Sequence, residues 1–173
     1  DEITGGSPYG ATTITGGNRP DTFNVGSGDF DTHFAANLNL VGEQGGDVLI
    51  VDDTADTGND SYTLNSGVFS KGNVSVTITY GFVENVQVNG SPGNNSFTFT
   101  SPGSASSVTL RGFAGSDTFT ITPSSTSTVS VEGSDPTVAP GDVLAFANAE
   151  SAGSATLVPN GAVNGTYNFS NAD

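Results

Sequence analysis

The chain of 173 residues contains no cysteine, methionine or tryptophan, and only three of its side chains are lysine or arginine. Without cysteine it can form no disulfide, no thiolate metal site and no cysteine nucleophile. Eighteen acidic residues give a formal charge of −15, which repels the phosphates of nucleic acids and anionic lipids and attracts cations. No apolar run approaches the roughly 20 residues of a membrane helix. We therefore expect no nucleic-acid partner and no membrane insertion.

The residues that are abundant favour strands and turns. The chain has 24 glycines and 8 prolines, and the usual helix-forming residues are scarce or confined to loops. This composition predicts an all-β protein, and the length predicts a single domain over residues 1–173. The missing initiator methionine suggests a mature subunit or an excised segment of a longer chain.

A short strand pattern that ends in glycine recurs along the chain. The closing glycines are spaced by about 24 residues, which indicates about seven repeats of one structural unit. Five copies are clear and two are looser. The clear copies are TTITG (12–16), LNLVG (38–42), VQVNG (86–90), VTLRG (108–112) and VSVEG (129–133), and the looser ones are YTLNSG (62–67) and ATLVPNG (155–161).

A second strand follows each clear copy and begins with an acidic or amide residue. These strands are DTFNV (21–25), DVLIV (47–51), NSFTF (95–99), DTFTI (117–121) and DVLAF (142–146). The two-residue period of a strand places their large apolar side chains on one face, which we expect to form the core. The expected core residues are Phe23, Val25, Leu49, Val51, Phe97, Phe99, Phe119, Ile121, Leu144 and Phe146.

A unit of this size cannot bury its apolar face alone, but it can do so by stacking on copies of itself. Equivalent strands would then lie parallel, about 4.8 Å apart, with like side chains in ladders. We therefore predict a right-handed parallel β-helix, or β-solenoid, of about seven coils. The alternative is a β-sandwich, which also has many short strands and frequent turns.

The turns before the second strands share a further pattern. They read GGNRPDTFN (16–24), GEQGGDVLI (42–50), GSPGNNSFT (90–98) and GFAGSDTFT (112–120). These turns resemble the RTX, or haemolysin-type, nonapeptide GGxGxDxUx. They also resemble the degenerate repeats of long bacterial surface proteins, in which ITYxGxExVxV stretches occur, as in ITYGFVENVQV (78–88) here. The resemblance implies a secreted or cell-surface bacterial repeat protein in which turn aspartates hold calcium.

The turn aspartates have two interpretations. They are Asp21, Asp47, Asp117 and Asp142. In the first, each carboxylate accepts hydrogen bonds from the backbone N–H groups of its own turn, as the amide of Asn95 also could. In the second, stacked carboxylates in the pairs Asp21 with Asp47 and Asp117 with Asp142 repel one another and bind calcium. One turn alone supplies fewer oxygens than the six to eight that calcium takes.

A separate acidic loop, VDDTADTGNDSY (51–62), is a second candidate calcium site. It carries Asp52, Asp53, Asp56, Asn59 and Asp60, with a glycine that permits a sharp turn. These residues supply enough oxygens for one ion if the loop folds back on itself. The alternative is a solvated run of charge on the surface.

The chain offers few groups for catalysis. Its basic side chains are Arg19, Lys71 and Arg111, with one histidine, His33, and we expect all four on the surface in separate units. No serine has a recognisable histidine and acid beside it. We therefore predict no enzyme activity and no catalytic residues, although parallel β-helices include polysaccharide-active enzymes.

The remaining function classes are structural and adhesive. The ends of a stack of coils expose unpaired strand edges, which promote self-association. The sequence therefore predicts a non-catalytic extracellular protein, either a stalk segment or a subunit of a filament or surface layer. The alternative is a calcium-dependent adhesin or binding module.

Overall fold

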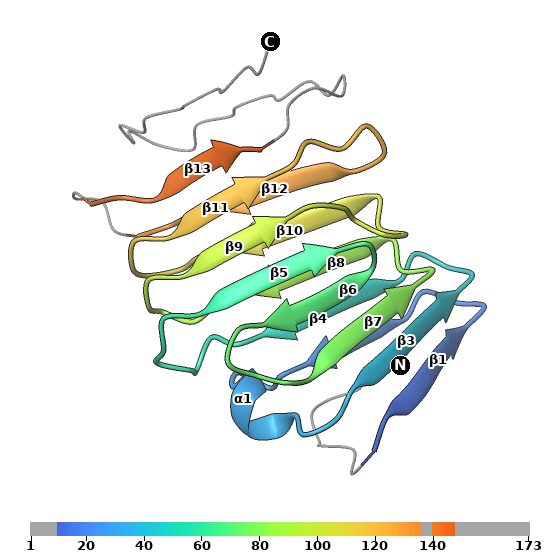
Figure 1. The fold of residues 1–173 in the computed structure, drawn as a ribbon. Helices are drawn as coiled ribbons and strands as arrows, with labels where there is room; N and C mark the ends of the chain where they lie inside the picture. The colour runs from blue at the N-terminus through green and yellow to red at the C-terminus, as the bar shows by residue number, and fades with distance from the viewer. Residues whose placement is uncertain (1–9, 136–139, 148–173) are drawn as a thin grey trace.

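The structure is a computed structural model and describes residues 10–135 and 140–147 of the chain. This part of the chain forms thirteen strands and one short helix, so the all-β prediction is confirmed (Figure 1). In chain order the elements are β1 (Thr12–Gly17), β2 (Thr22–Val25), α1 (Phe30–His33), β3 (Leu38–Glu43), β4 (Val48–Asp52), β5 (Ser61–Asn65), β6 (Val68–Lys71), β7 (Thr77–Gly81), β8 (Asn85–Asn89), β9 (Ser96–Phe99), β10 (Ser107–Arg111), β11 (Thr118–Ile121), β12 (Thr128–Glu132) and β13 (Val143–Phe146).

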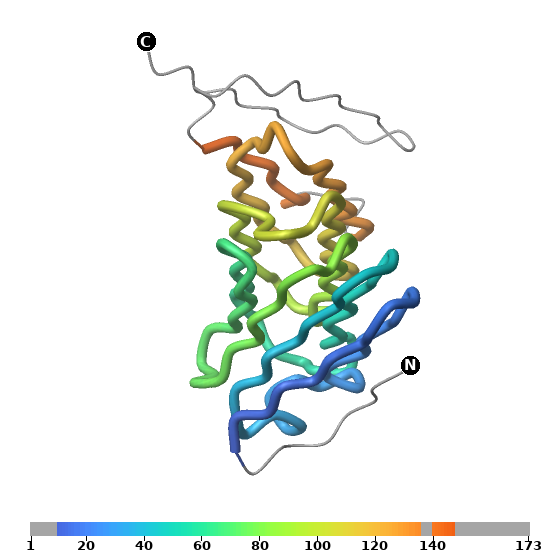
Figure 2. Tube along the Cα trace, turned by 90° about the vertical axis from the view of Figure 1, so that its right-hand side faces the viewer, coloured from blue at the N-terminus to red at the C-terminus, as the bar shows by residue number. Residues whose placement is uncertain are grey.

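The strands form two sheets that face each other across the core (Figures 1 and 2). Within the described residues, one sheet has eight strands in the order β1-β3-β7-β6-β5-β9-β11-β13, and the other has five in the order β12-β10-β8-β4-β2. The chain crosses from one sheet to the other after nearly every strand. Each circuit therefore adds one strand to each sheet.

Neighbouring circuits pair in parallel and in register. Thr12 pairs with Leu38, and Thr118 lies between Ser96 and Val143. All strand pairs of the described residues are parallel except the two that involve β6. Equivalent positions of successive circuits thus lie directly beside one another, as the recurring sequence pattern predicts.

The glycine-closed strands do not all belong to the same sheet. The glycine-closed strands β1 and β3 belong to the eight-stranded sheet, but β8, β10 and β12 belong to the five-stranded sheet. The expectation that all glycine-closed strands are equivalent is therefore wrong. The strand β8 instead pairs with β4, which carries the second pattern, so that Leu49 is beside Val86.

The change of sheet by the glycine-closed strands occurs at an inserted hairpin. β5 and β6 are antiparallel and joined through Ser66 and Gly67, both with positive φ, as a tight two-residue hairpin turn requires. β6 then pairs with β7, so two additional strands separate β7 from β9 in the eight-stranded sheet. In the five-stranded sheet the partners β4 and β8 stay adjacent. The eight-stranded sheet is therefore wider at this level, and β1, β3 and β7 fan away from the upper strands in Figure 1.

The core lies between the two sheets and is built from ladders of like side chains. Phe97 stacks on Phe119 with ring centroids 4.7 Å apart, and Tyr62 packs on Phe97 at 4.9 Å. The short helix α1 adds Phe30, which packs edge to face on Phe69 of the hairpin. Eight of the ten expected core residues are fully buried, and Leu144 and Phe146 are partly buried against them.

Candidate functional site

The connections between the sheets lie at two opposite edges of the molecule. At the right edge of Figure 1 the chain leaves the eight-stranded sheet through residues 18–21, 44–47 and 82–84. At the left edge it enters that sheet through residues 53–60, 90–95 and 112–117 and, before β13, through 140–142. The turn aspartates are divided between these edges, so they do not form one continuous row.

The right edge carries a ladder of three acidic side chains. The backbone N–H of Asp21 donates to Oδ1 of Asp47 at 2.8 Å. The N–H of Asp47 donates in turn to Oε2 of Glu84, also at 2.8 Å. Glu84 follows a shorter turn, and its longer side chain reaches the same position. The sequence analysis did not identify Glu84, although it lies in the ITYGFVENVQV stretch.

The left edge carries a ladder of four side chains. The N–H of Asp60 donates to Oδ1 of Asn95 at 3.0 Å, that of Asn95 to Asp117 at 2.8 Å, and that of Asp117 to Asp142 at 2.9 Å. A backbone bond joins the same two coils in the opposite direction: the N–H of Thr118 donates to the backbone carbonyl of Asn95. The side chains thus continue the strand pairing around the turn, where the backbone alone supplies no acceptor.

For Asp47, Asp117 and Asp142, the expectation that each carboxylate binds the N–H groups of its own turn is therefore wrong. The Oδ1 of each of these three instead accepts from the equivalent residue one coil earlier. A bond within the turn cannot hold two coils together, whereas this bond does. The two expected pairs, Asp21 with Asp47 and Asp117 with Asp142, are neighbours on their edges.

The closing glycines have a specific role in these turns. The second carboxylate oxygen, Oδ2, of the ladder aspartate occupies the position where the side chain of the closing glycine would lie. A Cβ at Gly112 would collide with Asp117, and one at Gly42 would collide with Asp47. The carboxylate thus fills the space that the glycine leaves, with the glycine five residues before Asp21, Asp47 and Asp117 and nine residues before Asp142.

Burial governs the electrostatics of the left-edge ladder. Asp117 is 1% exposed, and burial raises its pKa to about 6 despite the backbone hydrogen bond with Asn95, with a smaller contribution from Asp142. Burial also raises the pKa of Asp142. The ion pairs found among the described residues involve Lys71 and Arg111, and none includes Asp117 or Asp142.

A different arrangement surrounds Lys71, at the start of the left edge. Its ammonium lies 2.5 Å from Asp31, 2.7 Å from Asp53, 2.7 Å from Asp56 and 3.4 Å from Asp60. We call these five residues the Lys71 cluster. Lys71 is 2% exposed, so its expected place on the surface is wrong. The acidic loop does fold back on itself, and it folds around this ammonium.

Interactions within the Lys71 cluster, together with burial, shift the pKa values of its members. Burial alone would lower the pKa of Lys71, but its hydrogen bonds to Asp31, Asp53 and Asp56 outweigh burial and raise it. The hydrogen bond from Lys71 lowers the pKa of Asp56, whereas burial raises that of Asp60. The ammonium is therefore held in its charged form by the carboxylates around it.

Tyr62 fixes the cluster to the core. Its hydroxyl donates to Oδ2 of Asp53 at 2.7 Å and accepts from the N–H of Ser91 at 3.0 Å. The N–H of Phe30 donates to the other oxygen of Asp53 at 2.8 Å. Burial, followed by the bond to Asp53, raises the pKa of Tyr62. Asp53, which follows β4, thus links helix α1 to strand β5 of the hairpin.

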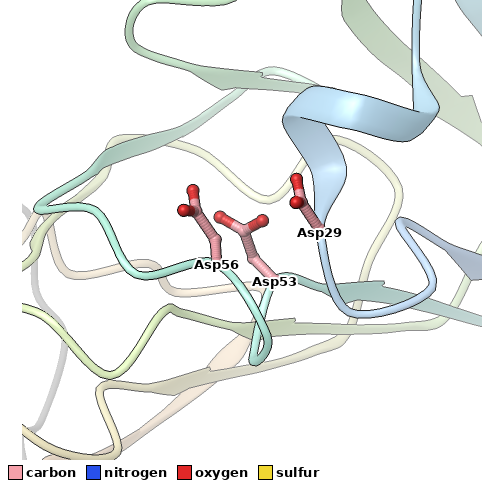
Figure 3. A group of neighbouring side chains, drawn as sticks. All are labelled: Asp29, Asp53 and Asp56. Carbon is pink, nitrogen blue, oxygen red and sulfur yellow. The ribbon is translucent and has the colours of Figure 1, made fainter.

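The carboxylates of this region have the spacing of possible metal ligands. Oxygens of Asp29, Asp53 and Asp56 lie within 4.8 Å of one another, as do those of Asp31, Asp56 and Asp60 (Figure 3 shows the first group). Asp52 is not in either group, and its side chain accepts from Thr54 instead. Calcium binding by the loop and ladder aspartates stays a prediction.

The other expected positions are simpler. Arg19 and His33 are exposed, as predicted, and Arg111 points outward, where it pairs with Glu132 at 2.8 Å. Asn59 accepts from the N–H of Asn94 in the next coil at 2.7 Å. It therefore belongs to a second, exposed ladder at the left edge rather than to the Lys71 cluster.

Comparison of the chain with protein-family models, with curated proteins and with solved structures gives no match. Among the helices of the described residues, none has the length and apolar character needed to cross a membrane.

Proposed function

We propose that this protein is a non-catalytic extracellular structural protein built as a right-handed parallel β-solenoid, whose coils stack end to end with those of a neighbouring unit. That unit is either another copy or the next segment of a longer stalk. The single observation that carries the proposal is the parallel, in-register pairing of successive circuits, with the same side-chain role at each rung. A pattern that adds one coil at a time has no built-in last coil.

The course of the chain supports the solenoid over a sandwich. In Figure 1 the chain runs rightward along the nearer sheet, returns along the farther one and rises by one strand with each circuit, apart from the hairpin. Sandwich strands need not carry matched sequences, whereas neighbouring strands on either side of the hairpin here do, as β1 with β3 and β8 with β10.

The outermost strand supports stacking at the N-terminal end. β3 is the only partner of β1 among the described strands. The N–H of Thr12 donates toward β3, and the alternation of a strand then directs the N–H of Thr13 to the open side. An exposed row of such donors is a template for another strand.

The adhesin alternative has weaker support. The most exposed aromatic side chain of the described residues is Phe82, at 64%, and the next is Phe113. They lie in turns at opposite edges, so they do not form one aromatic binding surface. The buried acidic groups bind backbone N–H groups or the Lys71 ammonium, which favours a structural role for them.

A tandem fusion of two complete chains tests the proposal. If the end coils stack, the fusion unfolds in one transition at a higher temperature than the single chain, and negative-stain images show continuous rods. Thr13→Pro in the second copy removes the open-side donor and abolishes the gain, whereas Thr13→Ala keeps it. Independent unfolding at the temperature of the single chain, together with a monomeric single chain at high concentration, would contradict the proposal.

A further inference from the structure

The left-edge ladder leaves half of one buried carboxylate without a partner. Oδ1 of Asp117 accepts the N–H of Asn95, but Oδ2 has no hydrogen-bond partner among the described residues. Asp117 is almost fully buried, and its Oδ2 lies over Gly112 inside the turn. A buried carboxylate oxygen without a donor is costly when the group is ionised.

The neighbouring rung shows which side chain satisfies this position fully. Asn95 uses Oδ1 for the bond to the preceding coil, as Asp117 does. Its amide nitrogen then donates to the carbonyl oxygens of Ser91 and Gly93 in its own turn, at 2.7 and 3.0 Å. The position thus takes an acceptor toward the preceding coil and a donor toward its own turn. An aspartate offers that donor only when it carries a proton.

The surroundings of Asp117 contain no compensating charge among the described residues. Asn95 faces it from the preceding coil and is neutral. Asp142 faces it from the next coil and is acidic, and Asp135 lies near Asp142. Arg111 is engaged outside with Glu132. The buried carboxylate of Asp117 and the partly buried one of Asp142 repel each other, and a proton on one of them removes that repulsion.

We propose that Asp117 is a proton-binding site through which mild acid tightens the stacking of the C-terminal coils. On protonation, Oδ2 becomes the donor that Asn95 supplies one rung earlier, and Oδ1 keeps its bond to the preceding coil. The raised pKa values of Asp117 and Asp142 agree with this assignment. The proposed proton site lies at the left edge, in the turns that lead into β9, β11 and β13.

The direction of the pH dependence follows from linkage. The pKa of Asp117 is about 6 in the folded chain against an ordinary value of 3.8. The folded state therefore takes up a proton at a pH where the unfolded state does not, so stability rises as the pH falls from about 7 toward 4. Above pH 7 both states are ionised and this contribution is absent.

The direct test is a pH titration of the wild-type chain in a buffer that contains a chelator. The chemical shift of the Asp117 carboxyl carbon, measured by NMR, reports its protonation. We expect a midpoint near pH 6. A midpoint below about pH 4.5 would overturn the proposal. This measurement needs no variant, so it stands even where a substitution prevents folding.

Two reciprocal substitutions test the link to stability. Asp117→Asn supplies the donor permanently, so its melting temperature at pH 7.5 exceeds that of the wild type by about 3 °C or more. The difference shrinks as the pH falls to 5. Asn95→Asp adds a second buried carboxylate and lowers the melting temperature at pH 7.5, and acid recovers the loss. Glu43→Gln, at an exposed position on the opposite edge, controls for a general loss of negative charge. Parallel melting curves for wild type and Asp117→Asn across this range would overturn the proposal.

Discussion

The Lys71 cluster and the left-edge ladder bury aspartates in neighbouring parts of one edge but compensate them differently. In the cluster, an ammonium lies within hydrogen-bond distance of three carboxylates, and it lowers the pKa of Asp56. In the ladder, backbone N–H groups replace the cation, and burial raises the pKa of Asp117. The comparison shows that backbone donors suffice to position a buried carboxylate but do not offset the rise in its pKa that burial causes.

The largest effect is expected from removing the cation of the cluster. Lys71→Met leaves four aspartates around an uncharged side chain, which costs about 3–5 kcal/mol of unfolding free energy. Chemical denaturation at pH 7 measures this loss. The matched control is Arg111→Met, which breaks the exposed pair with Glu132 and costs about 0–1 kcal/mol. Equal losses in the two variants would show that the buried ammonium has no special role.

The next effect concerns the space that glycine leaves for a ladder carboxylate. In Gly112→Ala the new Cβ collides with Oδ2 of Asp117, so either the turn or the carboxylate must move. We expect a loss of about 1–3 kcal/mol in thermal or chemical unfolding. Gly46→Ala is the control, because nothing lies within 4 Å of a Cβ there. Its effect should stay below about 1 kcal/mol.

Calcium provides a way to exchange one cation for another. In Lys71→Met the carboxylates lose their ammonium, and calcium can supply the opposite charge. Millimolar calcium should then raise the melting temperature of this variant by about 2 °C or more, and by a larger amount than in the wild type. Scanning calorimetry with and without calcium makes the comparison. An equal shift in both proteins would place the ion outside the cluster.

The smallest expected effect is the loss of folding stability at low pH that the Lys71 cluster causes. Asp56 has a lowered pKa, so its contribution is present above about pH 4 and is lost as the pH falls through its folded value. Wild-type stability should therefore fall below about pH 4, after the rise that Asp117 produces. Asp56→Asn should lose about 1 kcal/mol at pH 7 and show a shallower acid limb. A profile that rises without a maximum down to pH 3 would contradict this contrast.

Much of the fold follows from local sequence patterns. The two-residue alternation identified the strands and placed Phe97, Phe99, Phe119 and Ile121 in the core, because side-chain direction in a strand depends only on position. The 24-residue spacing also predicted that matched segments lie side by side, which holds on each side of the hairpin but not across it, where β4 pairs with β8. The division of the repeat between two edges was not predictable in this way, since it depends on how the hairpin β5–β6 is inserted in the sheet, and its partner β9 and the pair β4–β8 are distant in the sequence.

The candidate site was predicted only in outline. The sequence singled out the turn and loop aspartates but not Asp31 or Glu84. It also could not show that Oδ1 of Asp47, Asp117 and Asp142 binds the previous coil, because that contact joins residues 22 to 26 positions apart. Lys71 has no local signal of burial. An available signal was charge balance, since a loop with Asp53, Asp56 and Asp60 can be buried only with a cation nearby.

The most direct test of the account is whether the coils are joined as the ladder requires, and NMR couplings across hydrogen bonds measure it. The account predicts couplings from the Thr118 nitrogen to the Asn95 carbonyl carbon and from the Val143 nitrogen to the Asp117 carbonyl carbon. It also predicts one from the Asn95 nitrogen to the side-chain carboxyl of Asp117. Couplings from these nitrogens to antiparallel partners, or to carboxyls of their own turns, would contradict the stacked-coil arrangement.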